Sequence, residues 1–334
     1  MKLSLRRILV VMLFGVLVYG GYAVWSGVGK MRDALSGYAW WTFAVACALA
    51  FGNYVLRFLK WEFYLSRLEI RGIPKPQSFL VFLSGFVLTI SPGKVGEVFK
   101  SLVLFETYGV PMTRTAPIVV AERVTDVIGV VVLIVLGSLG FSGGLVWAGV
   151  GAALVGTLVL VVMSERASLG LVAIVERLPG PGKKIGEKVR AAYGSLRTLL
   201  SPANLVVPTL ISIGAWTLEC LALWVILRGF NEPVTVPLAT FFYATSTLAG
   251  AIIPVPGGLG VTETLLNRQM HELGHVSGPA ATGAMMLVRF ATLWFAVLVG
   301  FVALTLLKRM FPGLLAEKPK SAPNDDAPAN VPST

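Results

Sequence analysis

Six apolar runs in this chain are each long enough to cross a lipid bilayer. They cover residues 8–25, 38–59, 124–141, 145–163, 205–227 and 281–307. The hydrocarbon core of a bilayer is about 30 Å thick, so a crossing helix needs about 20 mostly apolar residues. A crossing segment must also satisfy its own backbone hydrogen bonds, which a helix does. The runs therefore predict an all-α polytopic membrane protein with about six full spans.

Charged residues are correspondingly rare. They make up 13% of the 334 residues, which is about half the share of an average soluble domain. The two cysteines, Cys47 and Cys220, both lie inside apolar runs. We therefore expect neither a disulfide framework nor a thiolate metal site.

The two histidines, His271 and His275, stand four residues apart in the string HELGH. This string formally fits the zinc-binding HExxH pattern, in which both histidines share one helix face. The segment is a short polar connection between apolar elements, with no nearby carboxylate arranged as a third ligand. We therefore expect a plain loop here, with no metal and no other cofactor.

The two ends of the chain are predicted to differ. Lys2, Arg6 and Arg7 precede the first apolar run, as in a signal peptide, but that run is too long and no Ala-x-Ala cleavage site follows it. We therefore expect a retained first span. Residues 316–334 are rich in Pro, Ala, Asn and Asp, a composition typical of disorder. The predicted organisation is one transmembrane domain at 1–315 followed by a disordered tail.

The same short phrase occurs twice inside apolar surroundings. It is SPGKVGEVFK at residues 91–100 and VPGGLGVTE at residues 255–263. Both contain Pro-Gly-x-(Val/Leu)-Gly, and an acid follows closely in each, Glu97 in the first and Glu263 in the second.

Pro92 and Pro256, at the start of these phrases, are predicted to break helices within the bilayer. Broken backbone is tolerated there only where protein or a water-filled cavity satisfies the freed hydrogen-bonding groups. Shorter apolar stretches at 78–90 and 238–253 run directly into the two phrases. We expect two re-entrant hairpins or pairs of broken spans, with a cavity between two halves of the protein, as in many transporters.

Lysine and arginine residues gather on one side of the predicted spans. With the N-terminus inside, nineteen of them fall in cytoplasmic segments and three outside, and Arg57 and Lys60 are counted among the nineteen. Cytoplasmic loops collect these residues. We therefore expect both termini to be cytoplasmic and the protein to lie in the cell (inner) membrane.

This orientation makes the two hairpins start from opposite faces of the membrane. Opposite polarity is the geometry of an inverted repeat, whose half-helix ends meet near the midplane around one substrate site. The polarity and the trailing acids favour that interpretation. The alternative is that Pro-Gly-x-x-Gly is a common loop string in glycine-rich membrane proteins.

The segment at residues 165–201 combines apolar residues at helical spacing with many lysines and arginines. A basic amphipathic helix on the cytoplasmic leaflet fits this pattern, since each basic residue near anionic lipid contributes about 1 kcal/mol. A solvated helix that only connects two spans fits it as well.

Nine ionisable residues are predicted at membrane depth, where each costs about 2.5 to 3.5 kcal/mol on insertion scales. They are Lys94, Glu97, Lys100, Glu122, Arg123, Asp126, Glu219, Glu263 and Arg289. Glu122 and Asp126 share a helix face, whereas Arg123 points elsewhere unless its side chain bends back. Arg123 is therefore expected to be the residue least neutralised by its own helix.

These residue types suit a lipid phosphate. Arginine offers a planar fork for phosphate oxygens, lysine a point charge, and the first turn of a half-helix beginning at Gly93 or Gly257 unpaired amide donors. Glycines also let the backbone approach a ligand closely. The predicted phosphate-binding residues are Lys94, Arg123, Arg289, Gly93, Gly96, Gly257, Gly258 and Gly260.

Four acids are predicted to balance these charges or to carry a proton that drives turnover. They are Glu97, Glu122, Asp126 and Glu263. The alternative is that Lys94 and Arg289 only neutralise Glu97 and Glu219.

The strings SPGKVGEVFK, AERVTD and PVPGGLGVTE, followed by a late arginine in the last apolar run, resemble the transmembrane domain of the lysylphosphatidylglycerol synthase family, also termed flippase-like. The resemblance covers residues 39–307 and implies movement of aminoacylated phosphatidylglycerol between leaflets. In stand-alone members it implies other lipids, including polyprenyl-phosphate-linked sugars and hopanoid precursors. This chain has Lys94 and Lys100 where the family often has arginine, which keeps the charge but loses the bidentate geometry.

Only 27 residues follow Leu307, so we expect a stand-alone member without the soluble domain that makes such lipids from aminoacyl-tRNA. The expected function is a lipid translocase and not an enzyme, since the sequence has neither a nucleotide-binding motif nor a DxD string. The alternatives are a membrane-embedded lipid-modifying transferase and a non-catalytic partner of a separately encoded lipid enzyme. Expected partners are lipids with anionic headgroups and not nucleic acid, and small residues on the spans also permit an oligomer.

Overall fold

A computed structural model describes residues 35–90, 97–141, 194–253 and 255–315, together with a few isolated positions between 146 and 192. All the regular secondary structure within these ranges is helical, as the apolar runs predict. The runs predicted at 8–25 and 145–163 and the tail at 316–334 lie outside the continuously described ranges.

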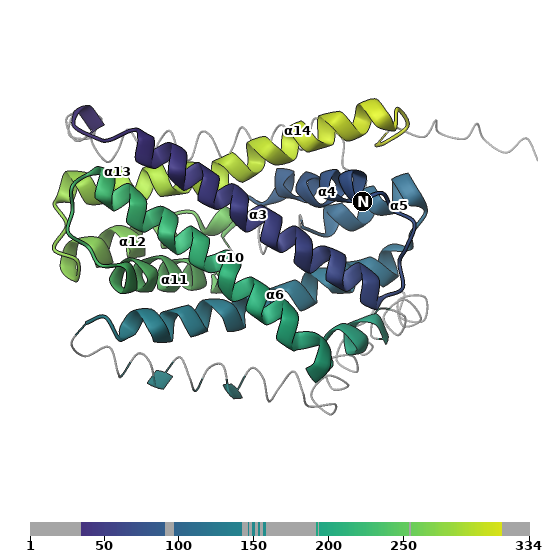
Figure 1. The fold of residues 1–334 in the computed structure, drawn as a ribbon, viewed down its shortest axis with the longest axis horizontal. Helices are drawn as coiled ribbons and strands as arrows, with labels where there is room; N and C mark the ends of the chain where they lie inside the picture. Colours follow the sequence, from purple (N-terminus) through teal and green to yellow (C-terminus); the bar gives the residue numbers. More distant parts are fainter. Residues whose placement is uncertain are drawn as a thin grey trace, which may run out of the picture.

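Long helices form the frame of the molecule (Figure 1). They are α3 (Trp41–Arg67), α6 (Met112–Ser138), α10 (Pro202–Gly229) and the continuous path through α13 (Gly278–Arg289), η4 (Phe290–Trp294) and α14 (Phe295–Met310). The first, the third and the last of these are long and apolar enough to cross a membrane. The 27-residue α6 carries four charged residues, Arg114, Glu122, Arg123 and Asp126. The structure thus confirms three apolar candidate spans.

The first hairpin consists of α4 (Lys75–Ser84), the short helix η1 (Gly85–Leu88) and α5 (Phe99–Tyr108). Ten residues of α-helix extend only about 15 Å, so neither α4 nor α5 crosses a bilayer. The Tyr108 hydroxyl hydrogen-bonds to Gln77 at the start of α4. The chain therefore enters and leaves the bundle at the same end.

The second hairpin consists of α11 (Val236–Ile252), the one-turn η3 (Pro256–Gly258) and α12 (Val261–Glu272). The Ser277 hydroxyl, just after α12, donates to Glu232 Oε1, just before α11, at 2.7 Å. This hairpin also returns to its starting end. The two hairpins open toward opposite ends of the bundle, the first on the right of Figure 1 and the second on the left.

Backbone conformation sets where α12 begins. The φ angles of Gly257, Gly258 and Gly260 are 62°, 69° and 84°, in the left-handed region that interrupts an α-helix and favours glycine. The half-helix predicted to begin at Gly257 therefore begins at Val261.

Contacts at the two ends fix the helix directions. Arg114, in the first turn of α6, donates to the Leu68 carbonyl just after α3. At the opposite end, Ala39 N donates to the carbonyl of Gly229, the last residue of α10, at 3.0 Å. Helices α3 and α10 are therefore antiparallel, and α6 runs opposite to α3.

Each hairpin packs on the long helix that follows the other hairpin. At the contact of α6 with α11, a Cβ added at Gly137 would lie 2.7 Å from the backbone N of Phe241. At the contact of α14 with η1, a Cβ added at Gly300 would lie 2.7 Å from the backbone N of Val87. Glycine is required at both positions because the two backbones touch.

The broken ends of the two hairpins meet inside the bundle. Ile90 packs with Leu293 and Val297, and Leu259 of the second break packs against the same group. A Cβ on Gly257 would lie 3.7 Å from the Ile90 Cα. Ile90, the last described residue before the first phrase, thus lies against the second phrase beside η4, a π-helical turn.

The two histidines do not share a helix face. His271 lies in the last turn of α12, whereas His275 has a φ of 51° beyond the end of that helix. Within the described residues, no group of three His, Cys, Asp or Glu side chains is arranged to hold a metal ion. The plain loop expected here is found for His275, whereas His271 is still helical because α12 ends at Glu272. In the basic segment 165–201, only the last residues are described, and Leu199 there is buried.

Candidate functional site

The first Pro-Gly phrase lies outside the described residues. Pro92, Gly93, Lys94 and Gly96 belong to it, so their predicted roles stay predictions. The structure begins again at Glu97, two residues before α5.

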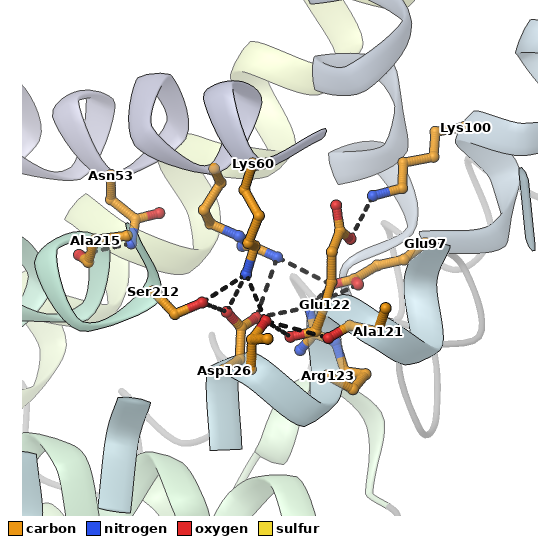
Figure 2. Close-up of polar contacts among 12 residues, drawn as sticks. Asn53, Lys60, Glu97, Lys100, Ala121, Glu122, Arg123, Asp126, Ser212 and Ala215 are labelled. Carbon is orange, nitrogen blue, oxygen red and sulfur yellow. Dashed lines mark hydrogen bonds and ion pairs between the residues drawn. The ribbon is translucent and has the colours of Figure 1, made fainter. Parts of the chain in front are cut away.

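Asp126 of α6 lies at the centre of a buried group of charges (Figure 2). Lys60 of α3 is fully buried, and its Nζ lies 2.5 Å from Asp126 Oδ1. Ser212 of α10 donates to the same oxygen at 3.0 Å and accepts from Lys60 at 2.8 Å. A buried ammonium is tolerated when it is paired and hydrogen-bonded. This contact ties three long helices together.

Arg123, expected to be the residue least neutralised by its own helix, is paired with an acid from outside that helix. Its Nη2 donates to both carboxylate oxygens of Glu97, at 2.7 and 2.8 Å. It also lies 3.4 Å from Asp126 Oδ2. Its closest partner, Glu97, belongs to another element, and the side chain also bends back toward Asp126 of its own helix.

Lys100 and Glu122 form a further buried ion pair between α5 and α6. The Lys100 ammonium also lies 4.7 Å from the centre of the Trp61 ring, a distance at which a cation is attracted to the ring face. We refer to the whole group as the charge cluster. Its members are Arg57, Lys60, Glu97, Lys100, Glu122, Arg123 and Asp126.

The sequence pattern assigned Arg57 and Lys60 to a cytoplasmic segment, and the structure places both inside a long helix, in contact with charged residues of α6. Helix α3 continues to Arg67, so both residues lie within it. Their spacing from Asn53, four and seven residues along, places all three on one helix face. Asn53 donates to the Ala215 carbonyl of α10 at 2.8 Å. This polar face could have indicated from the sequence that Arg57 and Lys60 belong to the helix. It was missed because the predicted span ended at residue 59, before Lys60.

A second ion pair fixes the second hairpin. Arg289 Nε donates to Glu263 Oε1 at 2.6 Å, and Arg289 Nη2 donates to the Gly257 carbonyl at 2.7 Å. Glu263 Oε2 accepts from Gly260 N at 2.8 Å, as the acid of a capping box does. Glu219, the partner considered for Arg289 in the sequence, accepts a hydrogen bond from Tyr243 at 2.6 Å.

The two Glu–Arg pairs have the same spacing in the chain. Glu97 and Arg123 are 26 residues apart, and so are Glu263 and Arg289. Each acid follows a Pro-Gly phrase, and each arginine lies on the next long helical path.

A polar cavity of ≈ 80 Å³ lies where the broken ends meet. This volume has room for several water molecules. Its polar and glycine lining comprises Tyr54, Arg57, Thr89, Trp216, Glu219, Tyr243, Thr247, Gly250, Gly257, Gly258, Thr262, Arg289 and Thr292. Arg289, Gly257 and Gly258, all among the predicted phosphate-binding residues, thus line one cavity. Among the described residues, the second arginine of the lining is Arg57 and not Arg123.

A family described as the lysylphosphatidylglycerol synthase TM region matches residues 12–300. Two relatives from Methanothermobacter thermautotrophicus are both named UPF0104 membrane protein. One is 22% identical over 308 residues, covering 84% of this chain and 87% of the relative. The other is 23% identical over 321 residues, covering 88% of this chain and 94% of the relative.

Proposed function

Because the chain belongs to the lysylphosphatidylglycerol synthase transmembrane-region family, we propose that it is a lipid translocase that moves a phosphate-containing lipid between leaflets. The proposed cargo is an aminoacyl-phospholipid, a polyprenyl-phosphate-linked lipid or a hopanoid-type lipid. The proposed location is the cell (inner) membrane, with both termini in the cytoplasm.

The observation that carries this proposal is the polar cavity between the broken ends of the hairpins. Arg57 and Arg289 line it, and arginine holds phosphate oxygens through paired donors. Ionisable side chains within a membrane protein are costly and usually mark a substrate or ion pathway. A lipid phosphate entering this cavity would meet two cations, the carboxyl group of Glu219 and glycine-rich backbone at one place.

An inverted repeat accounts for how the cavity arises. In support, the hairpins open at opposite ends, the two Glu–Arg pairs share a spacing of 26 residues, and each hairpin packs on the long helix beyond the other. In such repeats one half rocks against the other around a fixed site. Glu97, Glu122, Asp126 and Glu263 would balance charge or carry a driving proton during that motion.

The direct test is lipid exchange in proteoliposomes. Fluorescent phosphatidylglycerol, lysyl-phosphatidylglycerol and a short polyprenyl phosphate would be placed in both leaflets and quenched from outside. We expect one class to exchange faster than in protein-free vesicles. Folded protein that exchanges none of the three would contradict the proposal, and co-purification of a soluble transferase would then favour the partner of a lipid enzyme.

Motion of the hairpins is tested separately by linking their ends. Ile90→Cys and Leu259→Cys, placed in a chain with Cys47→Ala and Cys220→Ala, would be joined by a short cleavable thiol reagent. Exchange should stop on linking and return on cleavage, because the broken ends could no longer separate. Each single-cysteine chain, treated in the same way, is the control, and undiminished exchange in the linked chain would rule out the rocking motion.

A further inference from the structure

Arg57 occupies the boundary between the charge cluster and the cavity. Its Nη2 lies 3.7 Å from Glu97 Oε1 and 3.9 Å from Asp126 Oδ2. The guanidinium also lies 5.6 Å from the centre of the Phe86 ring, and the side chain lines the cavity. Arg57 is thus the one residue of the described charge cluster that also lines the described cavity wall.

The donors of Arg57 are poorly satisfied within the described part of the chain. Both acid partners lie beyond hydrogen-bond distance, since N–H···O bonds are 2.7 to 3.2 Å long. Its Nε is buried without a hydrogen-bond partner there, and so is the Thr89 hydroxyl on the same cavity wall. Arg289, by contrast, has Nε and Nη2 bonded to Glu263 and Gly257. Buried polar groups without partners are rare in folded proteins and call for an explanation.

We propose that Arg57 and Thr89 form the subsite that binds the phosphate group itself, a step that rests on the proposed function. The guanidinium fork would bind two phosphate oxygens and the Thr89 hydroxyl would donate to another. Arg289 would hold the second break in place and contribute its charge at longer range.

This subsite makes phosphate compete with two acids for one arginine. When phosphate binds, Arg57 moves away from Glu97 and Asp126 and toward the cavity. Asp126 keeps Lys60 as its partner at 2.5 Å, and Glu97 keeps Arg123. The acids therefore remain neutralised, and the cost of releasing Arg57 is small. Occupancy of the cavity is in this way linked to the first hairpin, which carries Glu97.

Binding to the purified full-length chain in detergent, followed by isothermal titration calorimetry, tests the subsite. The probes are dioctanoyl phosphatidylglycerol, glycerol 3-phosphate and inorganic phosphate, which separate a lipid headgroup from a free phosphate. We expect Arg57→Gln to weaken lipid binding by about tenfold to a hundredfold, the range for a lost charge-assisted hydrogen bond. Thr89→Val should weaken it by about three- to tenfold. Arg268→Gln, which removes an arginine from an exposed pair with Glu272, should leave it unchanged.

Removing Glu97, which competes with phosphate for Arg57, should strengthen lipid binding, whereas the changes above weaken it. Glu97→Gln should tighten lipid binding by at least about threefold, because Arg57 then has one acid fewer to leave. The gain should disappear in an Arg57→Gln background and persist in an Arg123→Gln background. The reverse pattern would assign the phosphate to Arg123 and overturn the subsite. If Arg57→Gln does not give folded protein, Arg57→Lys retains the charge without the fork and should bind less tightly than the wild-type chain.

The outcomes separate this inference from the proposed function. Equal binding by the wild-type chain, Arg57→Gln and Thr89→Val overturns the subsite, whereas lipid exchange by the wild-type chain would still support the translocase. Binding of inorganic phosphate without the lipid overturns the lipid headgroup as the ligand. Binding of none of the probes overturns the subsite, and the exchange assay then decides the function independently.

Discussion

The two Glu–Arg pairs share their spacing but not their surroundings. Arg289 is bonded to Glu263 and to the Gly257 carbonyl, and Glu263 is bonded in turn to Gly260 N. The partners of Arg289 and Glu263 all lie within residues 257–263, at the second break. Glu97, at the first break, is shared between Arg123 at hydrogen-bond distance and Arg57 at 3.7 Å.

This difference separates a fixed hairpin from an adjustable one. At the second break, one arginine is bonded both to Glu263 and to the backbone of the break. At the first break, helix α3 adds Arg57 and Lys60 beside Asp126, so that losing one contact leaves others. Each hairpin thus has a Glu–Arg pair with the same spacing in the chain, while the neighbouring helix adds further charges at only one of them.

The largest expected effect is at the fixed hairpin. Arg289→Ala would leave Glu263 buried without its cation and the Gly257 carbonyl without its donor. Removing one partner of a buried pair costs about 3 to 5 kcal/mol in the free energy of unfolding. Denaturant unfolding in detergent micelles would measure this loss, with Arg268→Ala at the exposed pair as the control. A variant as stable as that control would show that the second break is not held by Arg289.

The next largest effect is expected at the glycines where each hairpin packs on a long helix, and it tests whether the two hairpins are packed equally closely. Gly137→Ala and Gly300→Ala would each push a methyl group to within 2.7 Å of backbone, and overpacking of this kind costs about 1 to 3 kcal/mol. Comparable losses of unfolding free energy are expected. Gly214→Ala is the matched control, because its Cβ would lie 3.6 Å from Leu56 and alanine favours the helix. A loss of stability at only one of the two positions would show that the two hairpins follow similar chain paths but are not packed equally closely.

A smaller effect is expected at the adjustable hairpin. Arg123→Gln would remove the closest cation from Glu97, but Arg57 is already 3.7 Å away and can take its place. We expect a loss of about 1 to 2 kcal/mol in unfolding free energy, near the lower end for a hydrogen bond to a charged group. The double change with Arg57→Gln should cost more than the two single losses added together, because neighbouring residues couple. Strict additivity would show that Arg57 does not stand in for Arg123.

The smallest effect concerns a π turn that is present in only one of the two long helical paths that follow the hairpins. The last helical path contains the π turn η4, whereas α6 is α-helical throughout. The Tyr54 hydroxyl donates to the Thr292 carbonyl in this turn at 3.1 Å. Tyr54→Phe should lower the unfolding free energy by about 0.5 to 1.5 kcal/mol, measured by the same denaturant titration. An unchanged titration would show that this bond does not stabilise the π turn.

The sequence by itself determined the class of the protein and the position of its breaks. Long apolar runs require helices in a bilayer, and Pro-Gly phrases interrupt them, because both properties depend on residues that are close together in the chain. The predictions of apolar helices at 38–59, 205–227 and 281–307 were confirmed for this reason. The family resemblance was confirmed as well, since it rests on short strings in a fixed order.

Only the tertiary structure decided which charges meet. The sequence pattern assigned Arg57 and Lys60 to a cytoplasmic segment and indicated no partner for Arg123 on its own helix, whereas the folded chain buries Lys60 against Asp126 and joins Arg123 to Glu97. Ion pairs of this kind depend on which helices lie side by side and on how their faces are turned. Local hydrophobicity and periodicity report the face of one helix, but the neighbour that this face meets is chosen by the packing of the whole bundle.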